Sequence, residues 1–320
     1  MRMSINLNSN NNGFAERLTA KIAELANPTV LGLDPMLEYV PANIRDYLND
    51  RCSDPLLAAG MAITEFNRRL IDAVSDIIPA VKPQLAYYEQ YGPPGMDVFY
   101  EPCRYARSKG MLVIADGKRN DIGTTAAAYA RAYLGETQLE TESRAITEVD
   151  ALTINPYLGS DGIEPFLEQC SLHGKGVFIL VRTSNPSAGD LQDLKLADGR
   201  LVYESVADMV RKWGSGRAGS SGFGPVGAVV GATYPHQAAG LRERLPEAII
   251  LVPGYGAQGA TAADCAHNFT ADGRGAIVNA SRSLMLAYKK RELPPEAFDV
   301  ACREEAIAMR QALQTAITNR

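Results

Sequence analysis

The sequence predicts a (β/α)8 TIM barrel, an α/β fold, and three observations carry that prediction. Short apolar runs rich in β-branched residues recur along the chain, helical patterns lie between most of them, and the length is 320 residues. Strands that alternate with helices indicate a parallel sheet, and eightfold barrels of about 250 residues often carry additions. A doubly wound open sheet shows the same alternation and is the competing architecture. The eight predicted strands cover residues 29–33, 80–82, 112–115, 151–154, 176–181, 227–230, 248–252 and 276–278.

The helices are predicted from apolar residues at helical spacing. Two extra helices, at 13–26 and 295–318, should flank the barrel at its amino- and carboxyl-terminal ends. Because no linker or composition shift divides the chain, we expect a single domain over 1–320, with residues 1–12 as a frayed tail. Four helices of the barrel itself are predicted over residues 58–74, 124–134, 202–213 and 235–245.

One flexible-looking segment, the Gly- and Ser-rich stretch 214–224, follows a predicted helix and precedes a predicted strand. In a barrel this order places it on the amino-terminal face, away from the catalytic end. We therefore interpret it as a surface connection.

Composition excludes several classes of protein. The net charge is −5 without a basic block, which argues against a nucleic-acid partner. No apolar window approaches the length of a transmembrane helix, and the Asn-rich start lacks the apolar core of a signal peptide. Five scattered cysteines without a CxxC pair indicate reduced thiols in a cytoplasmic protein. The three histidines have no metal-ligand spacing, so we predict no metal site.

The most informative segment is DGKRND at 116–121, directly after an apolar run that is typical of a buried strand. Residues two apart in a strand share a face, so Asp116 and Lys118 should point the same way. Asp121 follows where a helical pattern begins. Two carboxylates around an ammonium at the exit of a buried strand are costly to assemble, which indicates a functional site.

Other polar residues follow the predicted strands, and barrel enzymes build their active sites at these carboxyl ends. A solvated strand end would explain each residue alone, but their convergence on one rim indicates an active site. In chain order the residues are Asp34, Lys82, Asp116, Lys118, Asn155, Pro156, Thr183, Ser184, the loop 253–259, Ser281, Arg282 and Ser283.

The loop GYGAQG at 254–259 matches the pattern GxGxxG. As a dinucleotide fingerprint it is weak, because it follows the seventh strand rather than the first. Loops after strands seven and eight of barrels commonly bind phosphate through backbone N–H groups. Arg282 would add a bidentate cation for the same phosphate. A tight turn beside a surface arginine is the alternative interpretation.

Taken together, these motifs resemble the orotidine 5'-phosphate decarboxylase family, in its longer bacterial (type 2) subfamily. The resemblance covers about residues 29–287, with the motifs in the family's order. The DxKxxD element also marks related phosphosugar barrels, so its combination with residues elsewhere makes the match selective. The motifs are Lys82, the run 116–122 with Thr125, TSNP at 183–186, PGYGAQ at 253–258 and SRS at 281–283.

The resemblance implies a carboxy-lyase that converts orotidine 5'-phosphate to UMP, the last step of de novo pyrimidine nucleotide biosynthesis, without a cofactor or metal. Lys118 would stabilise a carbanion at C6 electrostatically and then protonate it. Asp116, Lys82 and Asp121 would complete the catalytic set.

The resemblance also implies a homodimer, in which Asp121, Ile122 and Thr125 are supplied to the neighbouring site. The long polar loop 188–200 and the extended carboxyl-terminal segment depart from the family's pattern. The implied substrate contacts are Asp34 at the ribose, Ser184 at the pyrimidine, and Gln258 and Arg282 at the phosphate. Pro253 and Ser281 are further implied substrate-binding residues.

Three other functions remain open. An Mg²⁺-dependent β-keto sugar-phosphate decarboxylase would use the carboxylates as metal ligands and would be sensitive to EDTA. A Schiff-base aldolase would use Lys82 or Lys118 as a nucleophile, although the flanking carboxylates disfavour a free amine. A non-catalytic nucleotide-binding barrel would bind UMP without turnover.

Overall fold

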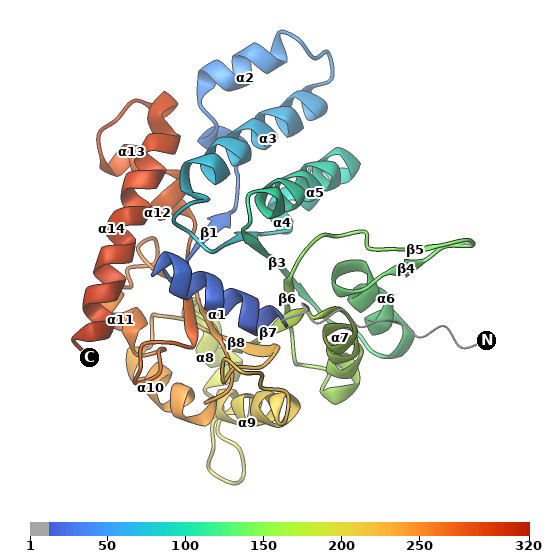
Figure 1. Ribbon diagram of the computed structural model, residues 1–320, viewed down its shortest axis with the longest axis vertical. Coiled ribbons are helices and arrows are strands. Elements are labelled where there is room, and N and C mark those ends of the chain that lie inside the picture. Colours follow the sequence, from blue (N-terminus) through green and yellow to red (C-terminus); the bar gives the residue numbers. More distant parts are fainter. Residues whose placement is uncertain (1–12) are drawn as a thin grey trace.

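The computed structural model describes residues 13–320, and its main feature is a closed barrel of eight parallel strands (Figure 1). Strand β1 pairs with both β2 and β10, which closes the sheet and confirms the barrel over the open-sheet alternative. The predicted frayed tail, residues 1–12, lies outside the described residues. The barrel strands are β1 Thr29–Leu33, β2 Ala80–Pro83, β3 Leu112–Arg119, β6 Ala151–Ile154, β7 Gly176–Arg182, β8 Val226–Val230, β9 Ile250–Val252 and β10 Ala276–Ala280.

The predicted helices are all present, with ends that differ by up to three residues. The carboxyl-terminal helix begins as a 3-10 turn at Pro295–Ala297 before it becomes α-helical. The α-helices are α1 Phe14–Leu25, α2 Ala42–Asn49, α3 Pro55–Val74, α4 Ala86–Glu89, α5 Gly92–Ser108, α6 Gly123–Leu134, α7 Ser160–His173, α8 Gly189–Gln192, α9 Val202–Gly214, α10 Pro235–Arg244, α11 Ala262–Ala266, α12 Arg282–Met285, α13 Ala287–Lys290 and α14 Phe298–Thr318.

Two features of the strands were not predicted. A hairpin of β4 Thr137–Gln138 and β5 Ser143–Arg144 projects beside α6 (Figure 1). Strand β3 runs four residues beyond the predicted end at residue 115, so it includes Asp116 and Lys118. The polar end of β3 pairs with β6 through Arg119 after an irregularity in register. The charged segment is therefore part of the barrel wall.

The barrel interior is apolar and is closed at its amino-terminal end by α1, which crosses in front of the strands in Figure 1. Phe14 of α1 meets Phe178 of β7 edge to face, with ring centroids 5.8 Å apart. Gly176 leaves room for this contact, because a Cβ there would lie 2.3 Å from the Phe14 ring. This plug leaves only the carboxyl-terminal end of the barrel open for a site.

The segment 214–224 connects α9 to β8 and so lies at the amino-terminal ends of the strands, as predicted. Glu16 of α1 accepts hydrogen bonds from the backbone N–H and the hydroxyl of Ser220, at 2.8 and 2.7 Å. These bonds join the connection to the helix that closes the barrel, and most of the segment is exposed, which supports its interpretation as a surface connection.

Candidate active site

A cavity of about 450 Å³ opens at the carboxyl-terminal ends of the barrel strands. Most of the side chains predicted for the site line this cavity together. They are Asp34, Lys82, Asp116, Lys118, Ser184, Pro253, Gln258, Ser281 and Arg282. The prediction that these separate strand ends converge on one rim is therefore confirmed.

Asp116 joins two lysines at the centre of one cavity wall. One carboxylate oxygen lies 2.6 Å from Lys82 Nζ and the other lies 2.6 Å from Lys118 Nζ. Thr153 of β6 donates its hydroxyl to Asp116 Oδ1 at 2.8 Å. Lys82 and Asp116 are buried, whereas the Lys118 side chain is 45% exposed. Of the two ammonium groups, that of Lys118 is the more accessible to a molecule in the cavity.

Burial and charge act in opposite directions on this cluster. Burial alone would raise the pKa of Asp116, but the neighbouring Lys82 and Lys118 charges and their hydrogen bonds hold that pKa well below its usual range. Burial alone would lower the pKa of Lys82, but the negative charges of Asp116 and Asp34 raise it instead. Both members of the buried pair therefore stay charged over a wide pH range.

The backbone around Lys118 adopts an unusual conformation that brings its ammonium back to Asp116. Lys118 has a φ of +47°, in the left-handed region that residues with a Cβ rarely occupy. Its N–H donates to Thr153 Oγ1 at 3.0 Å, and Arg119 donates to the Gly117 carbonyl at 3.1 Å. Asp116 and Lys118 meet as predicted, within a part of strand β3 whose backbone is irregular.

The opposite side of the cavity contains a Gly-rich loop. Gly254, Gly256 and Gly259 all have positive φ, which lets the loop fold tightly beside Gln258. Arg282 begins the short helix α12, next to Ser281. Gly32 of β1 is needed here, since a Cβ at that position would lie 1.9 Å from the Ser281 hydroxyl. Backbone N–H groups and one guanidinium can therefore face an anion at this end.

The predicted residues Asp121, Ile122 and Thr125 do not line the cavity of their own chain. Asp121 and Ile122 directly precede α6 and Thr125 lies in its first turn; Asp121 accepts a hydrogen bond from the Ile122 N–H at 2.8 Å. The Ile122 side chain is 54% exposed, and Thr125 is also exposed. Their role at a neighbouring site stays a prediction.

Sequence reasoning missed several cavity residues. Thr153 sits within a strand that was predicted by its apolar character, and its hydroxyl among apolar neighbours was the available signal. Asn279 lies one residue beyond a predicted strand end; it is buried, and its Nδ2 donates to Ser281 at 3.3 Å. Asn185 and Tyr255 also line the cavity. They belong to the motifs 183–186 and 253–258, in which other residues were predicted as substrate contacts.

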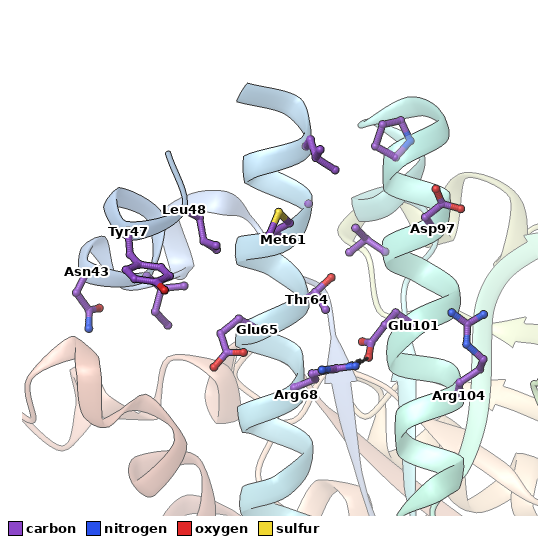
Figure 2. A pocket seen from close by; sticks show the side chains of 15 residues that line it. Asn43, Tyr47, Leu48, Met61, Thr64, Glu65, Arg68, Asp97, Glu101 and Arg104 are labelled. Carbon is purple, nitrogen blue, oxygen red and sulfur yellow. Dashed lines mark hydrogen bonds and ion pairs between the residues drawn. The ribbon is translucent and has the colours of Figure 1, made fainter. Parts of the chain in front are cut away.

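A larger cavity, of about 910 Å³, lies on the outside of the barrel between α2, α3 and α5 (Figure 2). Tyr47, Leu48 and Met61 form its apolar part, and an ion pair between Arg68 and Glu101 crosses its lower end. It contains none of the predicted site residues. We therefore assign the chemistry to the smaller cavity.

The side-chain clusters and the helices of residues 13–320 bear on metal and membrane binding. That part of the chain has no group of three or more His, Cys, Asp or Glu side chains that could hold a metal ion. None of its helices is both long and apolar enough to span a membrane.

The fold and site define a class: (β/α)8 barrels with a charged cluster and a Gly-rich loop at the carboxyl ends of their strands. Comparison with known proteins narrows this class. The profile described as "Orotidine 5'-phosphate decarboxylase / HUMPS family" matches residues 31–293. The chain belongs to this family.

Individual relatives agree with this membership. The chain is 46% identical to the orotidine 5'-phosphate decarboxylase of Rhodopirellula baltica, with 94% of this chain and 99% of the relative covered. It is 42% identical to the same enzyme of Caldicellulosiruptor saccharolyticus, over 86% and 90% of the two chains. Among solved structures, OMP decarboxylase of Leishmania donovani has 32% identity and a TM-score of 0.69, and the match covers 94% of this chain and 99% of that one.

Proposed function

We propose that this chain decarboxylates orotidine 5'-phosphate to UMP, as the last step of de novo pyrimidine nucleotide biosynthesis. The observation that carries the proposal is the Lys82–Asp116–Lys118 chain of ion pairs, with both contacts at 2.6 Å, in the wall of a cavity whose opposite side contains the Gly-rich loop 254–259. Family membership supports the same reaction. The free state of all five cysteines supports a cytoplasmic location.

The reaction poses an electrostatic problem. Breaking the bond between C6 and the carboxylate leaves an electron pair in the plane of the pyrimidine, where the ring π system cannot absorb it. The Lys118 ammonium stabilises this developing charge and then transfers its Nζ proton to C6, which gives UMP and CO2. The partial exposure of the Lys118 side chain leaves that ammonium accessible from the cavity.

One charge does not account for the reaction. At about 4 Å and an effective dielectric near 20, a single pair of charges is worth roughly 4 kcal/mol before desolvation. Enzymes typically lower barriers by about 8–23 kcal/mol. Binding of the phosphate by the 254–259 loop and Arg282, and of the ribose by Asp34, must therefore hold the base in position.

Asp116 has two roles in this proposal. Its two oxygens hold Lys82 and Lys118 apart and direct each ammonium. Its negative charge would also lie near the carboxylate of the bound substrate and would destabilise the ground state of the enzyme–substrate complex. Lys82 balances the buried charge and reaches a ribose hydroxyl.

We further propose a homodimer in which Asp121, Ile122 and Thr125 complete the neighbour's site. Two observations support it: these residues lie outside their own cavity, and Ile122 exposes an apolar side chain beside Asp121. An isologous interface would place this edge of each subunit at the other's cavity.

The direct test is to add orotidine 5'-phosphate to the protein in the presence of EDTA and to follow the ultraviolet absorbance. Metal-independent turnover is the expected result. Lys118→Ala should abolish it while UMP still binds, and Lys21→Ala, on the remote helix α1, should retain it. Activity near wild type in Lys118→Ala would contradict the mechanism. Loss of activity with EDTA would favour the metal-dependent sugar-phosphate reaction, and UMP binding without turnover would favour a binding protein.

A further inference from the structure

Arg182 is a fully buried arginine that the mechanism above does not use. It is the last residue of β7, and it is only 1% exposed. Burial of a guanidinium is costly unless its charge and its N–H groups are matched by partners. Arg182 directly precedes Thr183 and Ser184, which line the cavity, so its buried charge can act on the cavity edge.

A local irregularity of β7 turns Arg182 away from the cavity. Leu180, two residues earlier, lines the cavity, so regular alternation would direct Arg182 there as well. The pairing of β7 with β8 shifts register between Leu180 and Arg182, and such bulges redirect side chains next to active sites. The guanidinium instead lies 4.0 Å from the ring centroid of Tyr234 and 5.4 Å from that of Tyr203.

The guanidinium joins two neighbouring loops of the rim. Its Nε donates to Gln237 Oε1 at 2.7 Å, in α10 after β8. Its terminal nitrogens donate to Gln192 Oε1 at 3.2 Å and to Asp193 Oδ2 at 3.1 Å, both in the segment after β7. Each of the three guanidinium nitrogens therefore has a partner, and the partners come from two consecutive crossovers.

Gln192 relays this contact to the cavity edge. The same Oε1 that accepts from Arg182 also accepts from the Thr183 N–H at 3.0 Å. Its Nε2 donates to the Thr183 hydroxyl at 2.8 Å, and that hydroxyl donates to Asn185 Oδ1 at 2.6 Å. Thr183, Ser184 and Asn185 all line the cavity. A continuous hydrogen-bonded path thus leads from the buried charge to the segment proposed to contact the pyrimidine.

We propose that Arg182 is a positioning residue that fixes the 183–185 edge of the cavity through Gln192, and so sets the fit of the pyrimidine rather than of the phosphate. This inference rests on the proposed function for the identity of the ligand. Lysine cannot replace the arginine, because one ammonium lacks the planar fork that serves three partners and stacks on Tyr234.

The test compares two ligands that share the ribose phosphate and differ in the base. Dissociation constants of UMP and ribose 5-phosphate are measured by calorimetry for wild type, Arg182→Lys and Gln192→Ala. Gln192 is only partly buried, so its variant keeps the test open if Arg182→Lys fails to fold. Arg242→Lys is the matched control: Arg242 is also buried, but it donates to the carbonyls of Gly275 and Ala248, at the amino-terminal ends of β10 and β9.

Both test variants should weaken UMP binding and kcat/KM by about tenfold, since a hydrogen-bonded path to a charged group is lost. Ribose 5-phosphate affinity should stay unchanged, and the double variant should be no worse than Arg182→Lys. Arg242→Lys should lower the unfolding temperature and leave both affinities unchanged. Equal loss of both ligands, or unchanged UMP affinity in both test variants, would overturn the proposal. If the wild-type chain binds UMP without turnover, the proposed decarboxylase function is refuted. The role of Arg182 is still decided by the comparison of UMP and ribose 5-phosphate binding.

Discussion

Replacing Asp116 with asparagine should destabilise the protein mainly through Lys82. The Asp116 carboxylate is the hydrogen-bond partner of the Lys82 ammonium, and the Lys82 side chain is 5% exposed. Removing one partner of a buried ion pair costs about 3–5 kcal/mol, because the other charge is left buried and unpaired. Lys118 contributes less, since its half-exposed side chain can be solvated.

The remaining charge of Asp34 reduces this cost, because it also acts on Lys82. We therefore expect the lower end of the range, about 3 kcal/mol of unfolding free energy. For large domains, roughly 2–4 °C of unfolding temperature corresponds to each kcal/mol, which gives a decrease of about 6–12 °C.

The decrease in unfolding temperature caused by Asp116→Asn should depend on pH in a defined direction. In the wild type the pKa of Asp116 lies below its ordinary value of 3.8, so its contribution is present above that value and is lost as pH falls through the folded pKa. The pKa of Lys82 lies above 10.5, so its contribution is present below that value and is lost as pH rises through the folded pKa. The buried pair therefore contributes fully between roughly pH 5 and pH 10.

At alkaline pH the stability of Asp116→Asn should change with pH in the opposite direction to that of the wild type. Without the Asp116 carboxylate, burial lowers the pKa of Lys82 below its unfolded value, so the folded variant loses the Lys82 proton first. Its stability then rises, relative to wild type, as pH increases toward the unfolded pKa of 10.5. The difference in unfolding temperature should therefore narrow between about pH 7 and about pH 9.5.

Circular dichroism melts of both proteins at these two pH values provide the measurement. The double variant Asp116→Asn with Lys82→Met should recover most of the loss, because it removes the unpaired charge. Asp198→Asn is the matched control, since Asp198 pairs with Arg200 at the exposed surface. An equal deficit at both pH values, or a double variant no more stable than Asp116→Asn, would refute this reasoning.

Three further predictions concern the site. The variants Lys118→Ala and Asp121→Ala should each be inactive alone and should regain about a quarter of wild-type activity when mixed. Half of the random dimers would then contain one variant of each kind, and each of these dimers would have one intact site out of two. No recovery after demonstrated subunit exchange would contradict the shared site. Arg282→Ala should raise the Kd of UMP about tenfold or more but leave that of uridine unchanged, since a charged hydrogen bond to phosphate is lost. Gly32→Ala would put a Cβ 1.9 Å from the Ser281 hydroxyl, so it should raise KM for the substrate, and an unchanged KM would count against that contact.

Much of the fold followed from the spacing of apolar residues. Buried parallel strands are nearly continuous apolar runs, so β1 and β6 were predicted with their observed ends. The hairpin of β4 and β5 was missed because each strand has only two residues, and none of these residues is fully buried. Helix α2 was missed because it is a single short amphipathic helix inside the connection between β1 and α3.

The site was predictable to the extent that it depends on strand ends. A barrel brings the residues after each strand to one rim, so Asp34, Lys82 and Asp116 could be grouped without coordinates. Cavity residues inside strands were harder to predict, because the direction of a side chain depends on the register of its strand. Thr153 faces the cavity while Arg182 turns away from it after a bulge, and neither direction is encoded in an apolar pattern.

The unequal burial of the two lysines explains how one carboxylate can serve both stability and chemistry. Both ammonium groups lie 2.6 Å from Asp116, but only the Lys118 side chain is substantially exposed. In the proposed step Lys118 gives its proton to C6, and Asp116 then loses one of its two positive neighbours. Lys82 still lies 2.6 Å from the other oxygen, so the Asp116 carboxylate keeps one positive partner through the step. The buried ion pair thus holds the site in one charge state while the exposed lysine changes its own.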